Sequence, residues 1–305
     1  MSKKVGFVDI CSLESGELLS FLDSIKTIVF ACEGVLWYNS KVPIDGALEL
    51  FNKLSDGGKT IYLVSNNSIL STDELCKVAT NMGFKFAMNN IVSSVYLTAK
   101  CLRSKKVSKK VYIIGSDGLA DELRTIGINS LGPGPDVFST TVEARLETIE
   151  MDQNVEAVVI GLDVHLSYTK LIKAVTYLKD KSCQFIATSA ERAVPSNKKV
   201  CVPGAGSILR AVEKAAKRNA TVVGKPTDFC VEHFKEVVKL NPKTTLMIGS
   251  TCHEDVVFGQ KCGFYTLLVL TFETVEKLHT YKNIDSNLLP QYYVKSLNKL
   301  LDSIK

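Results

Sequence analysis

The sequence has few of the features that mark secreted, zinc-binding or membrane proteins. Its nine cysteines form no C-x-x-C pair, and none of its four histidines has zinc-finger spacing, which argues against a disulfide framework and a structural zinc site. No apolar run approaches the roughly 20 residues of a membrane span, and the first ten residues contain no apolar signal core. We therefore expect a soluble, cytoplasmic protein with reduced thiols and no membrane partner.

The basic residues also lack the pattern of a nucleic-acid-binding surface. The net charge is +5, but the lysines are scattered, and the basic cluster at residues 103–110 contains no aromatic side chain on which a base could stack. A solvated surface explains this charge, so we expect no nucleic-acid partner.

What the sequence does contain is an alternation of short apolar β-rich runs with helical patterns. With 305 residues and 46% hydrophobic residues, the chain is long enough for two α/β domains built on parallel sheets. We predict strands at 27–31 and 60–65, with a helix at about 44–54 between them. Ser71 and Glu74 have the spacing of a capping box at the start of the next helix. Further strands are predicted at 111–115, 156–162, 184–188, 244–249 and 265–270.

The first stretch with a chemical signature is KTIVFACEGVLWYNS, residues 26–40. A carboxylate nucleophile for phosphoryl transfer belongs at the C-terminal end of a strand, where loop N–H groups and helix N-termini converge on an anion. Ala31 stands at that point. This stretch resembles the first motif, DxDGVLW, of the haloacid dehalogenase (HAD) superfamily, in the branch of 4-nitrophenylphosphatase, phosphoglycolate phosphatase and pyridoxal phosphate phosphatase. The resemblance implies that Ala31 replaces the nucleophile and Glu33 the general acid/base.

Two further stretches follow predicted strands and are suited to phosphate. Ser65 and Asn66 lie in VSNNS, which is similar to the second motif of the family, and a hydroxyl with adjacent backbone N–H groups can cradle phosphate there. Lys225 lies in VVGKPT, which takes the place of the third motif, and its ammonium would neutralise phosphate charge.

The fourth stretch, MIGSTCHEDVVFG at residues 247–259, is similar to MVGDRxDTDIxFG, whose first Asp ligates Mg²⁺ in the family. Ser250 stands at that ligand position, and a hydroxyl is a poor substitute for a carboxylate toward a hard cation. Asp255 is retained and would support the metal site without ligating the metal. The resemblance thus implies a Mg²⁺ cofactor, but we expect its binding to be weak or absent here.

The resemblance covers about residues 24–300 and implies a Rossmann-like core with a large inserted α/β cap. We predict that residues 20–98 and 205–305 form the core and residues 99–204 the cap. Members of this branch associate through their caps, so a homodimer or a heterodimer with an active relative is expected. The substrate loop of the family, ATNxD, reads Ala187 to Glu191 here, so it has also changed.

The sequence therefore predicts a phosphatase homologue that has lost catalysis, a pseudophosphatase that binds a phosphorylated small molecule or pairs with an active relative. The alternative is a weakly active, Mg²⁺-dependent phosphomonoester phosphatase that uses Glu33. With neutral residues at positions 31 and 250, we expect the pocket around Lys225 to be net positive. Cys32 is a further candidate nucleophile, but strand alternation predicts that it faces away from positions 31 and 33.

Overall fold

The computed structural model describes residues 7–136, 141–142, 147–194 and 200–304, and its largest element is a seven-stranded parallel sheet. The strand order is β1-β16-β15-β14-β2-β5-β6. The strands span Val8–Asp9 (β1), Thr27–Ala31 (β2), Thr60–Ser65 (β5), Ile91–Ser93 (β6), Thr245–Gly249 (β14), Tyr265–Val269 (β15) and Tyr292–Val294 (β16).

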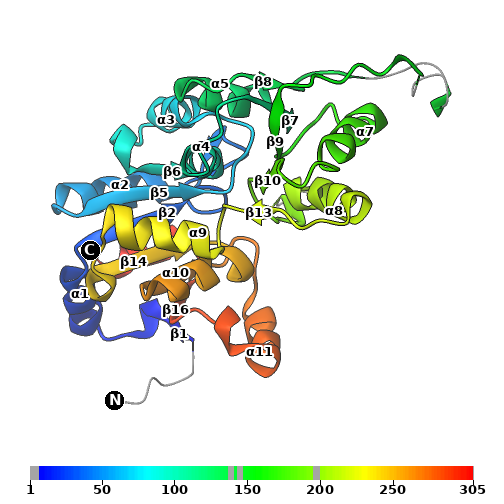
Figure 1. Cartoon of the computed structure of the whole chain (residues 1–305). Coiled ribbons are helices and arrows are strands. Elements are labelled where there is room, and N and C mark those ends of the chain that lie inside the picture. The colour runs from blue at the N-terminus through cyan, green and yellow to red at the C-terminus, as the bar shows by residue number, and fades with distance from the viewer. Residues whose placement is uncertain (1–6, 137–140, 143–146, 195–199, 305) are drawn as a thin grey trace.

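A second sheet of five strands is also parallel, with the order β13-β10-β9-β7-β8. In Figure 1 the blue N-terminal and orange-to-red C-terminal elements lie together around the first sheet, whereas α7 and α8 lie beside the second sheet in a separate unit. The five strands span Lys110–Ile114 (β7), Ser130–Leu131 (β8), Val155–Ile160 (β9), Gln184–Ala187 (β10) and Thr221–Val222 (β13). Two parallel sheets with crossover helices confirm the predicted α/β class and the core-plus-cap architecture.

Helices connect the strands of both sheets. Those of the first unit span Ser15–Ser24 (α1), Ala47–Asp56 (α2), Thr72–Asn81 (α3), Ser94–Ser104 (α4), Asp228–Glu232 (α9), Val257–Cys262 (α10), Val275–Ile284 (α11) and Leu297–Ser303 (α12). Those that connect strands of the second sheet span Asp117–Thr125 (α5), Tyr168–Tyr177 (α7) and Ala205–Ala216 (α8). Two π-helical turns, His233–Val238 (η3) and Cys252–Val256 (η5), follow α9 and precede α10. Two short hairpins pair Trp37–Tyr38 (β3) with Val42–Pro43 (β4) and Ala193–Val194 (β11) with Val202–Pro203 (β12). Within the described residues, no helix is long and apolar enough to cross a membrane.

Strand β2 lies in the middle of the first sheet because all five of its side chains can be buried. The run TIVFA is buried at every position, as expected for a strand that is covered by helices on both faces. It pairs with β14 on one side and β5 on the other. The carboxyl ends of these three strands therefore meet at one edge of the sheet, at Ala31, Ser65 and Gly249.

The helix after β5 begins as the sequence predicts. The hydroxyl of Ser71 accepts from the backbone N–H of Glu74, and the Glu74 carboxylate accepts from the backbone N–H of Ser71. This capping box satisfies two of the backbone donors that have no partner inside the helix, and it anchors α3 directly behind the turn that carries Asn66.

The predicted boundary between core and cap at residues 204/205 needs a correction. Strand β13 pairs with β10 of the second sheet, and Ile208, Leu209 and Val212 of α8 lie in the hydrophobic cluster of that sheet. The second unit therefore extends to about residue 222. At the other end, the boundary predicted at 98/99 falls inside α4. Periodicity identifies such elements but contains no information about which sheet they join.

Candidate active site

A pocket lies at the carboxyl ends of β2, β5 and β14, where ligands bind in open α/β sheets. Its volume is about 280 Å³, near the lower end of the roughly 300–1,000 Å³ usual for small-molecule sites. All seven residues that the sequence marks as site positions line it, together with residues of the second unit such as Leu162 and Glu191. The seven are Ala31, Glu33, Ser65, Asn66, Lys225, Ser250 and Asp255.

The floor of the pocket contains a methyl group and a thiol. Ala31 is the last residue of β2 and is buried. Cys32 also lines the pocket, so the prediction that it faces away from positions 31 and 33 is wrong. Alternation applies only within a strand, and β2 ends at Ala31. Burial raises the pKa of the Cys32 thiol to about 12, and a protonated thiol is a poor nucleophile.

Glu33 provides a carboxylate in the first motif, and the loop that follows it holds this group. Its Oε1 accepts from Trp37 Nε1 at 3.1 Å, and its Oε2 accepts from the backbone N–H of Asn39 at 2.8 Å. The Ser40 hydroxyl is a further donor, at 3.3 Å from Oε1. Burial raises the pKa of Glu33, although these hydrogen bonds oppose the shift. The side chain is thus held by residues 37–40 of its own loop.

The turn after β5 is organised by its own side chains. The Ser65 hydroxyl accepts from the backbone N–H of Asn67 at 3.0 Å, so that N–H group, which we expected to face an anion, is already used. The Asn66 amide makes two hydrogen bonds to the backbone of the third motif. Its oxygen accepts from the backbone N–H of Lys225 at 2.8 Å, and its nitrogen donates to the backbone carbonyl of Lys225 at 3.1 Å. This pair of contacts fixes the second and third motifs relative to each other.

Lys225 and Asp255 form a buried ion pair at the back of the pocket. The distance from Lys225 Nζ to Asp255 Oδ1 is 2.5 Å, and both side chains are at most 5% exposed. The other Asp255 oxygen accepts from the backbone N–H groups of Ser250 and Thr251. Burial lowers the pKa of Lys225, but the contact with Asp255 outweighs this and the net pKa is raised. Lys225 is therefore a charged lysine with one of its three N–H donors already used.

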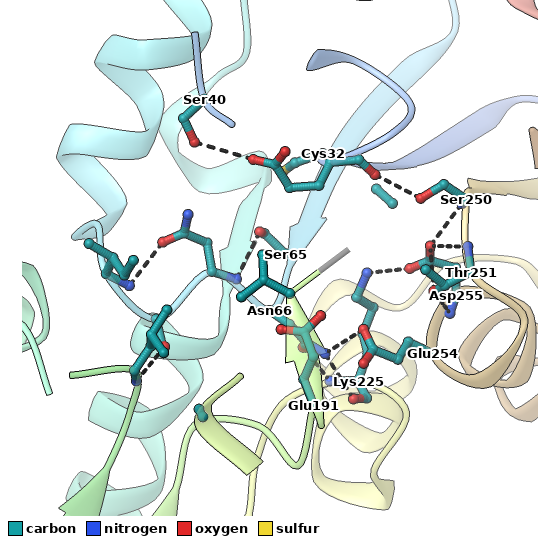
Figure 2. A pocket seen from close by; sticks show the side chains of 18 of the residues that line it. Cys32, Ser40, Ser65, Asn66, Glu191, Lys225, Ser250, Thr251, Glu254 and Asp255 are labelled. Carbon is teal, nitrogen blue, oxygen red and sulfur yellow. Dashed lines mark hydrogen bonds and ion pairs between the residues drawn. The ribbon is translucent and has the colours of Figure 1, made fainter. Parts of the chain in front are cut away.

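The pocket is also lined by two carboxyl groups that the sequence motifs did not assign to the site. Glu254 comes from η5, and Glu191 comes from the loop after β10, in the second unit. Figure 2 shows Glu191, Glu254 and Lys225 grouped at one side of the pocket. Burial and the neighbouring Glu254 raise the pKa of Glu191 to about 9, and burial raises that of Glu254 to about 7. Both carboxyl groups therefore favour their protonated form more than an exposed glutamate does.

These carboxyl groups correct the expected charge of the site. Among the described residues that line the pocket, four are acidic and Lys225 is basic, and Lys225 is paired with Asp255. This described lining is therefore not net positive. The altered substrate loop gave a sequence signal for Glu191, but its position opposite Glu254 depends on how the two units pack.

The resemblance implies that the carboxylates missing at positions 31 and 250 would both ligate Mg²⁺, and the residues that stand there do not fit this role. Ala31 has no oxygen in its side chain. The Ser250 hydroxyl donates to the backbone carbonyl of Glu33 at 2.7 Å (Figure 2), and Asp255 is engaged by Lys225 and two N–H groups. Among the residues that the structure describes, no group of three or more His, Cys, Asp or Glu side chains could hold a metal ion.

Comparisons with known proteins agree with this fold. A family model described as haloacid dehalogenase-like hydrolase matches residues 28–129, and a second, described as HAD-hydrolase-like, matches residues 222–300. Glycerol-3-phosphate phosphatase of Rattus norvegicus is 31% identical over 96% of this chain and 95% of its own length. Human chronophin is 32% identical over 96% of this chain and 98% of its own.

A solved structure of 4-nitrophenylphosphatase from Thermotoga maritima is similar over 93% of this chain and 99% of its own, with 25% identity and a TM-score of 0.76. A second solved structure, of a glycerol phosphate phosphatase from Mycobacterium tuberculosis in complex with magnesium, shares the fold at 21% identity, with a TM-score of 0.72 over 92% of this chain and 77% of its own. The names of these proteins favour the alternative prediction, an active phosphatase, over the predicted loss of catalysis. The extent of the sequence identity with the curated relatives shows that the chain belongs to the haloacid dehalogenase-like hydrolases, in the phosphatase branch.

Proposed function

We propose that this protein binds a small phosphomonoester at the carboxyl edge of its first sheet and does not cleave it through an aspartyl-phosphate intermediate. The observation that carries the proposal is the buried methyl group of Ala31 at the end of β2. A methyl group cannot attack phosphorus or ligate a metal. Deletion of a covalent nucleophile can lower turnover about a million-fold, as in one protease series.

The remaining groups support binding of the phosphate. The Lys225 ammonium has three N–H donors, and its contact with Asp255 uses one of them. The hydroxyl of Ser65 lines the same pocket. The absence of carboxylates at positions 31 and 250 removes two of the negative charges that Mg²⁺ offsets in the family. We therefore propose that Mg²⁺ binding is weak or absent and that phosphate binding needs no metal.

The second candidate is a weakly active, Mg²⁺-dependent phosphomonoester phosphatase that uses Glu33. The name glycerol-3-phosphate phosphatase, given to a relative that matches 96% of the chain, favours it, and Glu33 lines the pocket. To act as a nucleophile, Glu33 would have to leave its contacts with Trp37, Asn39 and Ser40.

Turnover of 4-nitrophenyl phosphate, measured with and without Mg²⁺, distinguishes the two candidates. We expect the protein to be no faster than its Ser65→Ala variant at any Mg²⁺ concentration. Mg²⁺-stimulated turnover that is lost in Glu33→Gln and kept in Glu49→Gln would establish the second candidate. Glu49 is a suitable control because it is exposed on α2, away from the pocket.

A homodimer formed through the second unit, or a heterodimer with an active relative, is part of the proposal. Apolar side chains gather on the surface around the start of α7, where Val164 is 80% exposed and Leu166 and Tyr168 are also exposed. Exposed apolar groups that lie close together mark association surfaces. A cytoplasmic location remains a prediction from the sequence.

A further inference from the structure

We propose that the phosphomonoester held in this pocket also carries an ammonium group, so that the ligand is a phosphorylated primary amine whose cationic end lies between Glu191 and Glu254. This inference rests on the proposed function, because it assigns the phosphate to Lys225 and Ser65. It adds a ligand class and two residues that determine specificity.

The amide of Asn66 connects the Glu254 carboxylate to the backbone of Lys225. Its nitrogen donates to Glu254 Oε2 at 3.2 Å as well as to the Lys225 carbonyl at 3.1 Å. The Asn66 oxygen accepts from the Lys225 N–H. A single side chain that is 9% exposed thus holds Lys225 and Glu254 side by side, and a ligand that contacts Lys225 also meets a carboxylate.

Glu191 faces Glu254 from the second unit, so the acidic pair lies between the two units (Figure 2). Two neighbouring carboxyl groups repel each other when both are ionised, so a positive charge placed between Glu191 and Glu254 would stabilise both. An ammonium group has three N–H donors. The ammonium group can therefore donate to both carboxylates at once. A hydroxyl group has only one hydrogen and can donate fully to only one of them.

The balance of charge in the cavity favours a ligand with both signs. The Asp255 carboxylate offsets the Lys225 charge, while Glu33 and the Glu191–Glu254 pair add negative charge, and the part of the lining that the structure describes has no second lysine or arginine. A phosphate ester alone therefore gains the contact with Lys225 but is also repelled by these carboxylates. An ammonium group on the same molecule turns this repulsion into attraction, and about 280 Å³ has room for a molecule of that size.

Calorimetric titration of the full chain with three matched probes at pH 7.5 tests the inference. The probes are O-phosphoethanolamine, ethyl phosphate, which has the phosphate without the amine, and ethanolamine, which has the amine without the phosphate. We expect O-phosphoethanolamine to bind about tenfold more tightly than ethyl phosphate, as a hydrogen-bonded charge pair would give. The preference should fall to about twofold or less in Glu191→Gln and Glu254→Gln, and it should persist in Glu49→Gln.

The comparison of the three probes uses the wild-type protein alone, so it does not depend on whether a variant folds. Each outcome therefore supports or overturns the inference. Equal affinity for ethyl phosphate and O-phosphoethanolamine overturns the ligand class and leaves the proposed function intact. If neither phosphate compound binds, both fail. Binding of ethanolamine as tight as that of O-phosphoethanolamine would mean an amine site without a phosphate site, which also contradicts both.

Discussion

The hydroxyl of Ser250 donates a 2.7 Å hydrogen bond to the backbone carbonyl of Glu33, 217 residues earlier in the chain. This contact connects the loop after β2 to the end of β14, two strands that pair in the first sheet. In the family, the first and fourth motifs are expected to bind one metal ion together. Here a neutral hydrogen bond joins these two motifs.

Restoring both carboxylates should create a Mg²⁺ site. We expect the double variant Ala31→Asp/Ser250→Asp to be destabilised without metal, because two carboxylates would lie close together at the floor of the pocket. Mg²⁺ should raise its melting temperature and leave the wild-type protein unchanged, since a hard cation needs charged oxygen ligands. Melting curves with Mg²⁺ and with EDTA measure this. An equal Mg²⁺ response in both proteins would contradict the expectation.

Inorganic phosphate should stabilise the wild-type protein without added metal. A ligand at a hundredfold excess over its Kd contributes about 2.7 kcal/mol, which thermal shift detects, and EDTA should not reduce it. For the same reason, the Ala31→Asp/Ser250→Asp variant should bind phosphate only with Mg²⁺. The anion-binding hypothesis fails if the wild type is not stabilised or is stabilised only when Mg²⁺ is present.

Substitution of Lys225 should lower both stability and phosphate binding. Lys225→Ala leaves the buried Asp255 carboxylate without its cation, which costs about 3–5 kcal/mol in the free energy of unfolding. Chemical denaturation measures the cost, and thermal shift should show little phosphate response. Lys225→Met/Asp255→Asn removes both charges and is the matched control, because it should recover much of the stability without recovering phosphate binding. Recovery of binding in this control would show that the lysine charge is not what holds the anion.

Stability should decrease as the pH rises toward 9. The Glu191 pKa of about 9 in the folded protein is above its ordinary value of 4.5, so the folded state holds a proton that the unfolded state releases. This contribution is complete below about pH 4.5 and is lost as the pH rises through the folded pKa. The groups that act on Glu191 are Glu254, Lys225 and Asp255.

Replacement of Glu191 tests this origin of the pH dependence. Because Gln cannot ionise, Glu191→Gln should be more stable than the wild type at pH 9 by at least about 1 kcal/mol, and the two should be closer at pH 5. Denaturant titrations at both pH values measure this difference. Parallel pH profiles for the two proteins would mean that Glu191 is not the group responsible.

Association through the second unit should depend on its exposed apolar side chains. Val164→Glu and Tyr168→Glu place charges on the surface at the start of α7, where both side chains are more than half exposed, and they should convert a dimer to a monomer in sedimentation velocity. Val42→Glu is a matched control, since Val42 is 58% exposed on the β3–β4 hairpin of the other unit. A wild-type protein that stays monomeric at all concentrations and binds no active relative would exclude this proposal.

Local sequence determined the elements that carry the site. The run TIVFA can only be a buried strand, and the structure has it at Thr27–Ala31 as predicted. The capping box of Ser71 and Glu74 forms as expected, because its contacts join residues three apart. Six of the seven predicted site positions lie at or just after the carboxyl ends of neighbouring parallel strands of the first sheet, whereas Lys225 reaches the same pocket from the end of β13 in the second sheet.

Packing between distant elements decided the rest. Whether α8 and β13 join the first or the second sheet depends on contacts made elsewhere in the chain, and hydrophobic periodicity is the same in either sheet. Glu191 and Glu254 are on different units, and only the way those units pack brings the two carboxyl groups into one pocket. The sequence by itself therefore determined which chemical groups the site lost, whereas the tertiary structure decided which charges it gained.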